Sequence, residues 1–235
     1  MFRNPHKERR QGVPVDQAYA DRREAGRELG GLLQKYANRH DVIVLALPRG
    51  GVPVAFEVST ALAAPLDVFL VRKLGTPGRR ELAMGAIASG GVRVLNDDVV
   101  QYLGITRDQI DAVAREEQRE LERREAAYRG DRPLPSLENK SVILVDDGLA
   151  TGSTMRAAVQ AVMQRNPARV VVAVPVGASE TCEELRGLAD EVVCGRTPTP
   201  FSAVGQWYLN FDQTTDAEVS ALLGRESTLT PHHAM

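Results

Sequence analysis

The sequence predicts an α/β protein built on a mainly parallel, doubly wound sheet. Short apolar runs alternate with amphipathic stretches along most of the 235 residues, and this alternation is typical of a parallel sheet covered by helices on both faces. Several runs are apolar at every position, as in strands buried on both sides. Glycine-containing loops follow two of these runs, and helical patterns follow both loops.

The first third of the chain predicts two helices, two buried strands and a loop. Apolar residues recur at helical spacing over residues 16–36, with charges on the other face. A strand is expected at 42–47, a helix at 52–63 and another strand at 66–71. Residues 72–81 carry two glycines, a proline and several cations, so we interpret them as a mobile loop.

The middle third predicts a hairpin and a charged helix. Residues 86–95 suit two strands joined at a Gly-Gly pair. Thr106 and Gln109 form a capping-box pattern, which predicts a helix that continues to about Tyr128. Because Arg and Glu are dense along it, we interpret it as an inserted, solvated helix with paired charges rather than as a nucleic-acid face.

The last third completes the alternation of strands and helices. Strands are expected at 142–145, 169–176 and 191–194, with helices after the first two. A short helix at 216–223 closes the chain. We expect one domain over 16–223 and flexible ends at 1–15 and 224–235.

Composition excludes several classes of partner. The chain has 29 basic and 31 acidic residues and a formal net charge of -2, so no overall field favours nucleic acid. Cys182 and Cys194 are too few for a disulfide framework. No apolar run has the length of a membrane span, and we expect a cytoplasmic protein. The histidines lack zinc-type spacing: His6, His40, His232 and His233.

The most informative stretch follows the strand at 142–145. Asp146 and Asp147 stand at its carboxyl end, where open α/β sheets bind ligands. The small residues after them can surround an anion, because Gly152 permits close backbone approach and a helix start offers unpaired N–H groups. The expected anion loop consists of Ala150, Thr151, Gly152, Ser153 and Thr154.

Three common motifs are absent from the sequence. The loop at 148–154 lacks the lysine that a P-loop places after its last glycine. No Gly-x-Gly-x-x-Gly opens the first strand-helix unit, and no Gly-x-Ser-x-Gly nucleophile elbow occurs. Nucleoside triphosphate hydrolysis, dinucleotide binding and esterase chemistry therefore lose support.

Residues 142–154 resemble the phosphoribosyl pyrophosphate (PRPP) signature of type I phosphoribosyltransferases. Four apolar residues precede two acidic residues and then Thr-Gly-x-Thr, in Val-Ile-Leu-Val-Asp-Asp-Gly-Leu-Ala-Thr-Gly-Ser-Thr. Leu-Pro-Arg-Gly-Gly at 47–51 stands where the family has its pyrophosphate loop, and Arg-Lys-Leu-Gly at 72–75 resembles the start of its flexible catalytic loop. The resemblance covers about residues 16–223 and extends to a bacterial group whose acceptor substrate is unassigned.

This resemblance implies transfer of a 5-phosphoribosyl group from PRPP to a nitrogenous base, with release of pyrophosphate and Mg²⁺ as cofactor. Asp146 and Asp147 would hold the ribose hydroxyls and orient metal-bound water, and residues 150–154 would hold the monophosphate. The pyrophosphate would meet three catalytic cations and two backbone N–H donors: Arg49, Arg72, Lys73, Gly50 and Gly51.

The resemblance says less about the acceptor base. Arg-Lys-x-Gly and Ala-Thr-Gly are similar to adenine-type enzymes, whereas 6-oxopurine enzymes usually carry an aspartate at the position of Ala150. Residues 76–80 depart from the adenine pattern, so a purine-like acceptor is only slightly favoured. A hood around 197–211, with N-terminal parts, would cover the base. Trp207 and Tyr208 would stack on the base there or, alternatively, pack in the core.

Two other functions stay open at this point. The chain could be a PRPP-sensing regulator without turnover, or a hydrolase of an activated ribosyl phosphate. Dimers are common in this family, although the sequence does not fix the oligomeric state. Because no apolar run has the length of a membrane span, we expect no membrane partner.

Overall fold

A five-stranded parallel sheet forms the centre of the structure, in the order β2-β1-β6-β7-β8. The computed structural model describes residues 17–130 and 132–229. Every neighbouring pair in this sheet is parallel, which confirms the predicted sheet. Its strands are β1 (Val42–Ala46), β2 (Leu66–Val68), β6 (Ser141–Val145), β7 (Arg169–Val176) and β8 (Glu191–Arg196).

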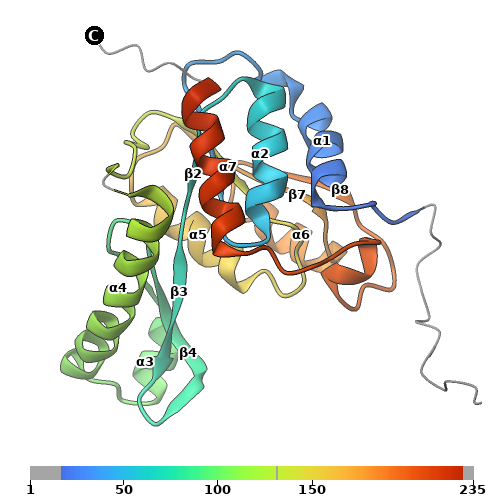
Figure 1. Cartoon of the computed structure of the whole chain (residues 1–235). Coiled ribbons are helices and arrows are strands. Elements are labelled where there is room, and N and C mark those ends of the chain that lie inside the picture. Colours follow the sequence, from blue (N-terminus) through green and yellow to red (C-terminus); the bar gives the residue numbers. More distant parts are fainter. Residues whose placement is uncertain (1–16, 131, 230–235) are drawn as a thin grey trace, which may run out of the picture.

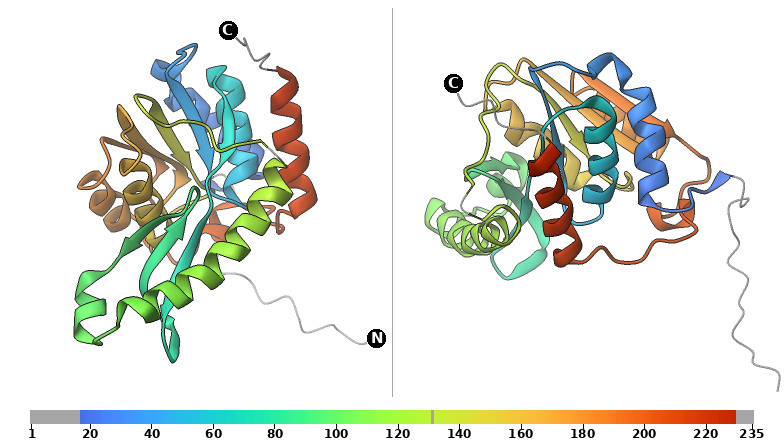
Figure 2. Two further views of the ribbon diagram at one scale, coloured as in Figure 1. Left: turned by 90° about the vertical axis from the view of Figure 1, so that its left-hand side faces the viewer. Right: turned by 45° about the horizontal axis from the view of Figure 1, so that its top comes forward.

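Helices cover both faces of this sheet (Figures 1 and 2). Side chains alternate across a strand, so Val42 and Val44 of β1 pack with one helix layer, and Ile43 and Leu45 pack with the other. The first layer contains α1 (Arg22–Leu32), α2 (Gly51–Leu62) and α7 (Asp216–Leu229); the second contains α5 (Ser153–Met163) and α6 (Ser179–Arg186). Burial on both faces is the main stabilising contribution to this core.

The first helix is shorter than the sequence predicts. It begins at Arg22, because the Asp21 carboxylate accepts hydrogen bonds from the N–H groups of Arg23 and Glu24, both at 2.9 Å. Tyr19 instead forms an isolated β-bridge with Tyr208. A 3-10 turn, Gln34–Tyr36, follows α1. The apolar side chain of Tyr19 therefore packs outside the helix, in a cluster with Trp207 and Tyr208.

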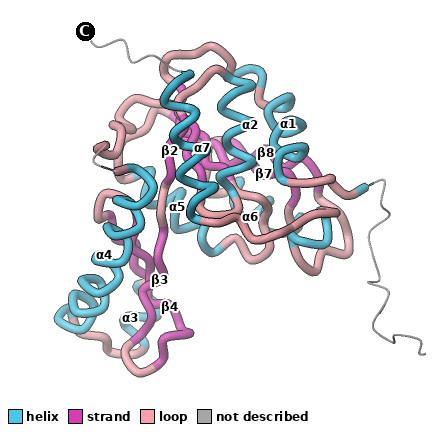
Figure 3. The backbone as a smooth tube through the Cα atoms, viewed as in Figure 1, coloured by secondary structure: helices cyan, strands magenta, loops and turns pink. Residues whose placement is uncertain are grey.

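Residues 71–129 form an arm that projects from the core (Figures 1 and 2). We call this segment the arm. It contains an antiparallel sheet in the order β3-β4-β5 and two helices (Figure 3). Its elements are β3 (Val71–Thr76), β4 (Arg79–Ala88), β5 (Val92–Leu95), α3 (Asp97–Tyr102) and α4 (Arg107–Arg129).

The arm corrects two predictions. The strand expected at 66–71 ends at Val68, and Val71 starts a strand of the other sheet. The interpretation of residues 72–81 as a loop is wrong, because they form a hairpin in which Lys73 pairs with Ala86. The glycines and proline that favoured a loop lie at the bulge and turn of this hairpin, where Gly78 has a φ of 77°.

The inserted charged helix is confirmed as α4. Both halves of its Thr106–Gln109 capping box are present. Its apolar stripe, which includes Ile110, Ala114 and Leu121, is buried, so one face packs while the charged faces meet solvent. The final helix reaches Leu229 rather than Leu223.

Among the helices of the described residues, none is long and apolar enough to cross a membrane. The predicted flexible ends lie largely outside the described residues, and so do His6, His232 and His233.

Candidate active site

The loops after β1 and β6 leave the sheet side by side at its carboxyl edge. Ala46 and Val145, the last residues of these neighbouring strands, are paired in register. The peptide bond between Pro48 and Arg49 in the first loop is cis. The two loops expected from the sequence to bind one ligand therefore start at the same point.

The two glycines of the first loop allow it to approach the second. A Cβ on Gly50 would collide with the carboxylate of Asp147. A Cβ on Gly51 would lie 2.7 Å from the carbonyl oxygen of Val145 and 2.9 Å from the Cα of Asp146. Only glycine fits at either position without displacing a neighbour.

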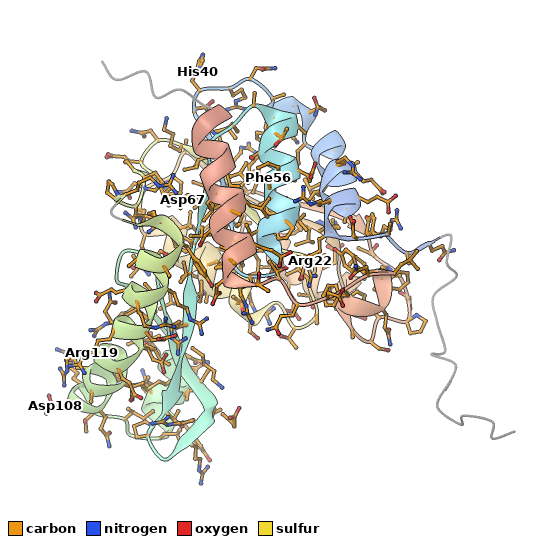
Figure 4. All side chains as sticks on the ribbon, viewed as in Figure 1. Arg22, His40, Phe56, Asp67, Asp108 and Arg119 are labelled. Carbon is orange, nitrogen blue, oxygen red and sulfur yellow. The ribbon has the colours of Figure 1, made fainter. Side chains whose placement is uncertain are left out.

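Asp147 is held by three hydrogen bonds. Its Oδ2 accepts from Nε of Arg22 at 2.9 Å. Its carbonyl oxygen accepts from the hydroxyl of Tyr208 at 2.6 Å, and its N–H donates to Oδ1 of Asp146 at 2.8 Å. Figure 4 shows Arg22 beside the N-terminal ends of α1 and α2, on the side where the two loops lie.

Burial disfavours the charged form of both carboxyl groups. Burial and the adjacent charge of Asp147 raise the pKa of Asp146 well above its ordinary value. Burial also raises the pKa of Asp147, although the Arg22 guanidinium opposes that rise. The site therefore favours a ligand that brings hydrogen-bond donors or positive charge to these oxygens.

The anion loop at 150–154 leads into α5 as predicted. Gly152 adopts a left-handed conformation with a φ of 67°, and no side chain caps the helix start at Ser153. The first N–H groups of α5 thus lack a side-chain acceptor, which is the arrangement that binds phosphate. Thr181 of α6 donates to the carbonyl oxygen of Ala150 at 2.7 Å, and Arg156 donates to that of Thr151 at 2.5 Å.

The three predicted catalytic cations are not all at this edge. Arg49 lies on the first loop, with Nη1 3.9 Å from Oδ1 of Asp216. Arg72 donates from Nε to Glu117 of α4 at 2.5 Å, and Lys73 donates to the carbonyl oxygen of Glu81 at 3.2 Å. Across residues 17–130 and 132–229, neither arm cation has a hydrogen bond or ion pair with the carboxylates or the anion loop. They line a groove of about 500 Å³ between the hairpin and α4.

Trp207 and Tyr208 pack inside the protein. They are 6% and 4% exposed and form a cluster with Tyr19 and Val176. The Phe201 ring stacks on Trp207 with centroids 6.5 Å apart. This burial favours the packing alternative, and stacking of either ring on a base stays a prediction.

Sequence reasoning missed Arg22, Arg156 and Thr181. Arg22 lies next to a helix cap in a charged stretch, where nothing local distinguishes it from Arg23. Thr181 reads as a helix-start residue, and its bond to Ala150 depends on β7 lying beside β6. Tertiary packing brings Arg22 and Thr181 to the site, whereas Arg156 contacts the loop five residues before it through the first turns of α5.

The described residues contain no group of three or more His, Cys, Asp or Glu side chains able to hold a metal ion. Asp146 and Asp147 offer two carboxylates.

A family model for the phosphoribosyl transferase domain matches residues 17–206. The chain belongs to the phosphoribosyl transferase family. This confirms the resemblance drawn from residues 142–154 and places the chain in a family of transferases. All five strands of the parallel core lie within the matched residues.

Two further similarities are to a curated relative and to a solved structure. The chain is 50% identical over 207 residues to the "Putative phosphoribosyl transferase Rv0571c" of Mycobacterium tuberculosis, which covers 88% of this chain and 46% of that protein. This phosphoribosyl transferase chain thus spans about half the length of the curated relatives it matches. The crystal structure of TT1426 from Thermus thermophilus is 43% identical, with a TM-score of 0.78 over 88% of this chain and 97% of that chain.

Proposed function

We propose that the chain transfers the 5-phosphoribosyl group of PRPP to a nitrogenous base and releases pyrophosphate, through its domain at 16–223. The observation that carries this proposal is the position of Asp146 and Asp147, packed against the Arg49–Gly51 turn on one side and followed by the anion loop on the other. PRPP carries a pyrophosphate and a monophosphate on opposite ends of a hydroxyl-bearing ribose, so its chemistry matches that order of groups.

The reaction would break the bond between the anomeric carbon and the pyrophosphate oxygen. The electron pair leaves with pyrophosphate, and a ring nitrogen of the base supplies the pair for the new bond. Arg49 and the N–H groups of Gly50 and Gly51 would stabilise the charge that gathers on the leaving group. Asp146 and Asp147 would accept hydrogen bonds from the ribose hydroxyls, and residues 151–154 would donate to the monophosphate.

The donor set fits Mg²⁺ that arrives with the substrate. Magnesium is commonly bound through one or two carboxylates together with substrate phosphates, and it keeps several waters. Asp146 and Asp147 would contact such an ion through water. When bound, the ion would neutralise charge on the pyrophosphate oxygens.

In this proposal, the hairpin of β3 and β4 acts as a lid that carries the cations Arg72 and Lys73. To reach the pyrophosphate they must leave Glu117 and Glu81, so closure of the hairpin is a requirement of this role. Closure would also exclude water, which otherwise competes with the base.

A purine-like base remains the slightly favoured acceptor. Because no carboxylate stands at Ala150, other groups must activate the base.

Pyrophosphate release from PRPP and Mg²⁺ tests the proposal. The reaction is run with the purified chain against purine, pyrimidine and other nitrogenous acceptors. Release that depends on one acceptor supports transfer. Release that does not depend on any acceptor indicates a hydrolase, and binding of PRPP without release indicates a sensor; either result contradicts the proposed function.

A further inference from the structure

Arg22 contacts both the carboxylate pair and the segment at 208–212. Its Nε donates to Oδ2 of Asp147 at 2.9 Å, and its Nη1 donates to the carbonyl oxygen of Asp212 at 2.7 Å. Its guanidinium carbon lies 3.9 Å from the centre of the Phe211 ring. One side chain from α1 therefore joins the carboxylate pair to residues 208–212.

This contact is partly shielded from solvent. The side chains of Arg22 and Asp147 are 11% and 15% exposed, so their ion pair is less screened than a surface pair. The neighbouring Arg23 is different, because its side chain is 45% exposed and pairs with Glu57 at 3.3 Å. Two adjacent arginines of one helix thus have distinct environments.

Hydrogen bonds hold one oxygen of the Asp147 carboxylate and both backbone polar groups of Asp147. Among the described residues, the hydrogen bond to this carboxylate is made at Oδ2, by Arg22. The backbone N–H and carbonyl of Asp147 are held by Asp146 and Tyr208. With one oxygen and the main chain fixed, the direction of Oδ1 is fixed as well.

We propose that Arg22 is a positioning residue that aims the Asp147 carboxylate at the ribose hydroxyls and links it to residues 208–212. The inference rests on the proposed function, because it takes the ribose of PRPP as the ligand of Asp147. A planar guanidinium suits this role, since its Nε, Nη1 and face reach Asp147, Asp212 and Phe211 in three directions. A lysine ammonium has neither a rigid fork of donors nor a flat face to stack on Phe211.

The test compares Arg22→Gln, Arg22→Lys and the matched control Arg23→Gln by calorimetric titration. The probes are Mg²⁺ with PRPP, ribose 5-phosphate, and Mg²⁺ with inorganic pyrophosphate, which has no ribose. We expect Arg22→Gln to weaken PRPP and ribose 5-phosphate binding about tenfold or more, the usual loss for a hydrogen bond to a charged group. Pyrophosphate affinity should stay within about twofold, and Arg23→Gln should bind all three as wild type does.

The outcomes separate positioning from support of the fold. Equal weakening of all three ligands by Arg22→Gln indicates general damage to the site and overturns the inference. Unchanged PRPP affinity in Arg22→Gln also overturns it while leaving the proposed function intact. If wild type binds no PRPP, the proposed function itself fails. Arg22→Lys keeps the positive charge and serves as the second variant if Arg22→Gln unfolds. Its affinity for PRPP should lie between those of wild type and Arg22→Gln. Wild-type affinity in Arg22→Lys contradicts the role of the planar guanidinium.

A double-mutant cycle with Phe211 tests the link to residues 208–212. Arg22→Gln, Phe211→Ala and the double variant are compared by their Kd for PRPP with Mg²⁺. If Arg22 acts through its stacking on Phe211, the combined effect should differ from the product of the single effects by at least about threefold. If the effect of the double variant on the Kd equals the product of the single effects, the two side chains act independently. That result would show that Arg22 does not act through Phe211.

Discussion

At Gly50, the absence of a side chain leaves the space that the Asp147 carboxylate occupies. The same pair also illustrates the limit of local patterns. The sequence predicts that residues 47–51 and 142–154 form ligand loops, yet it does not indicate that Gly50 touches Asp147. That contact depends on β1 lying directly beside β6.

The substitution Gly50→Ala should weaken binding of PRPP with Mg²⁺ by about tenfold or more, because the new methyl group displaces the Asp147 carboxylate. Gly31→Ala is the matched control, since a Cβ there meets nothing within 4 Å and the residue lies inside α1. That control should keep wild-type affinity and gain about 0.5–1 kcal/mol of stability. Titration calorimetry and urea unfolding measure the two effects. Equal PRPP affinity in both variants contradicts the close approach of the loops.

Asp41 gives a prediction on pH dependence. Hydrogen bonds from Arg39 and Ser141 lower the pKa of Asp41 to about 2, below its value in the unfolded chain. A lowered folded pKa stabilises the protein above the unfolded pKa, and this contribution disappears as the pH falls through the folded pKa. The difference in unfolding free energy between wild type and Asp41→Asn should therefore be constant above about pH 5 and shrink toward about pH 2. A difference that does not change with pH, measured by urea unfolding, would contradict the shift.

At the scale of elements, predictions held where the pattern was local and were wrong where a partner strand decides the structure. The strands at β6 and β7 and the capping box of α4 follow from burial and helix-start chemistry within each segment. Residues 72–81 look irregular alone, because their glycines and proline outweigh a weak alternation. Pairing of β3 with β4 makes them a hairpin, and no local signal reports that pairing.

The sequence also does not predict how the arm joins the core. Arg129, at the end of α4, has a side chain only 4% exposed and lies 3.1 Å from Asp67 of β2. It also donates to the carbonyl oxygen of Val68 at 2.8 Å. This buried pair attaches the charged helix to the edge of the central sheet.

Arg129→Met should destabilise the protein by about 3–5 kcal/mol, because it leaves the Asp67 carboxylate buried without its cation. Arg124→Met is the control on the same helix, as Arg124 makes a surface pair with Glu120; its cost should stay below about 1 kcal/mol. Urea unfolding measures both. Similar losses in the two variants would show that the buried pair has no special part in holding the arm.

At the scale of the whole molecule, the site lies where the parallel sheet ends. Alternation of strands and helices predicts a parallel sheet, and a parallel sheet brings its loops to one edge. The strand order β2-β1-β6-β7-β8 does not follow from the alternation. It is this order that places the glycine turn beside the carboxylates, so the sequence predicts the components of the site but not their assembly.

Calorimetric titration of the chain with PRPP and Mg²⁺ tests whether the carboxylate pair binds the substrate. The variants are wild type, the double variant Asp146→Asn with Asp147→Asn, and Asp41→Asn as a control. Asp41 directly precedes β1 and so lies at the opposite edge of the sheet. We expect binding by wild type and Asp41→Asn, and a loss of at least about tenfold in the double variant. Unchanged affinity in the double variant would show that PRPP does not bind at the carboxylate pair.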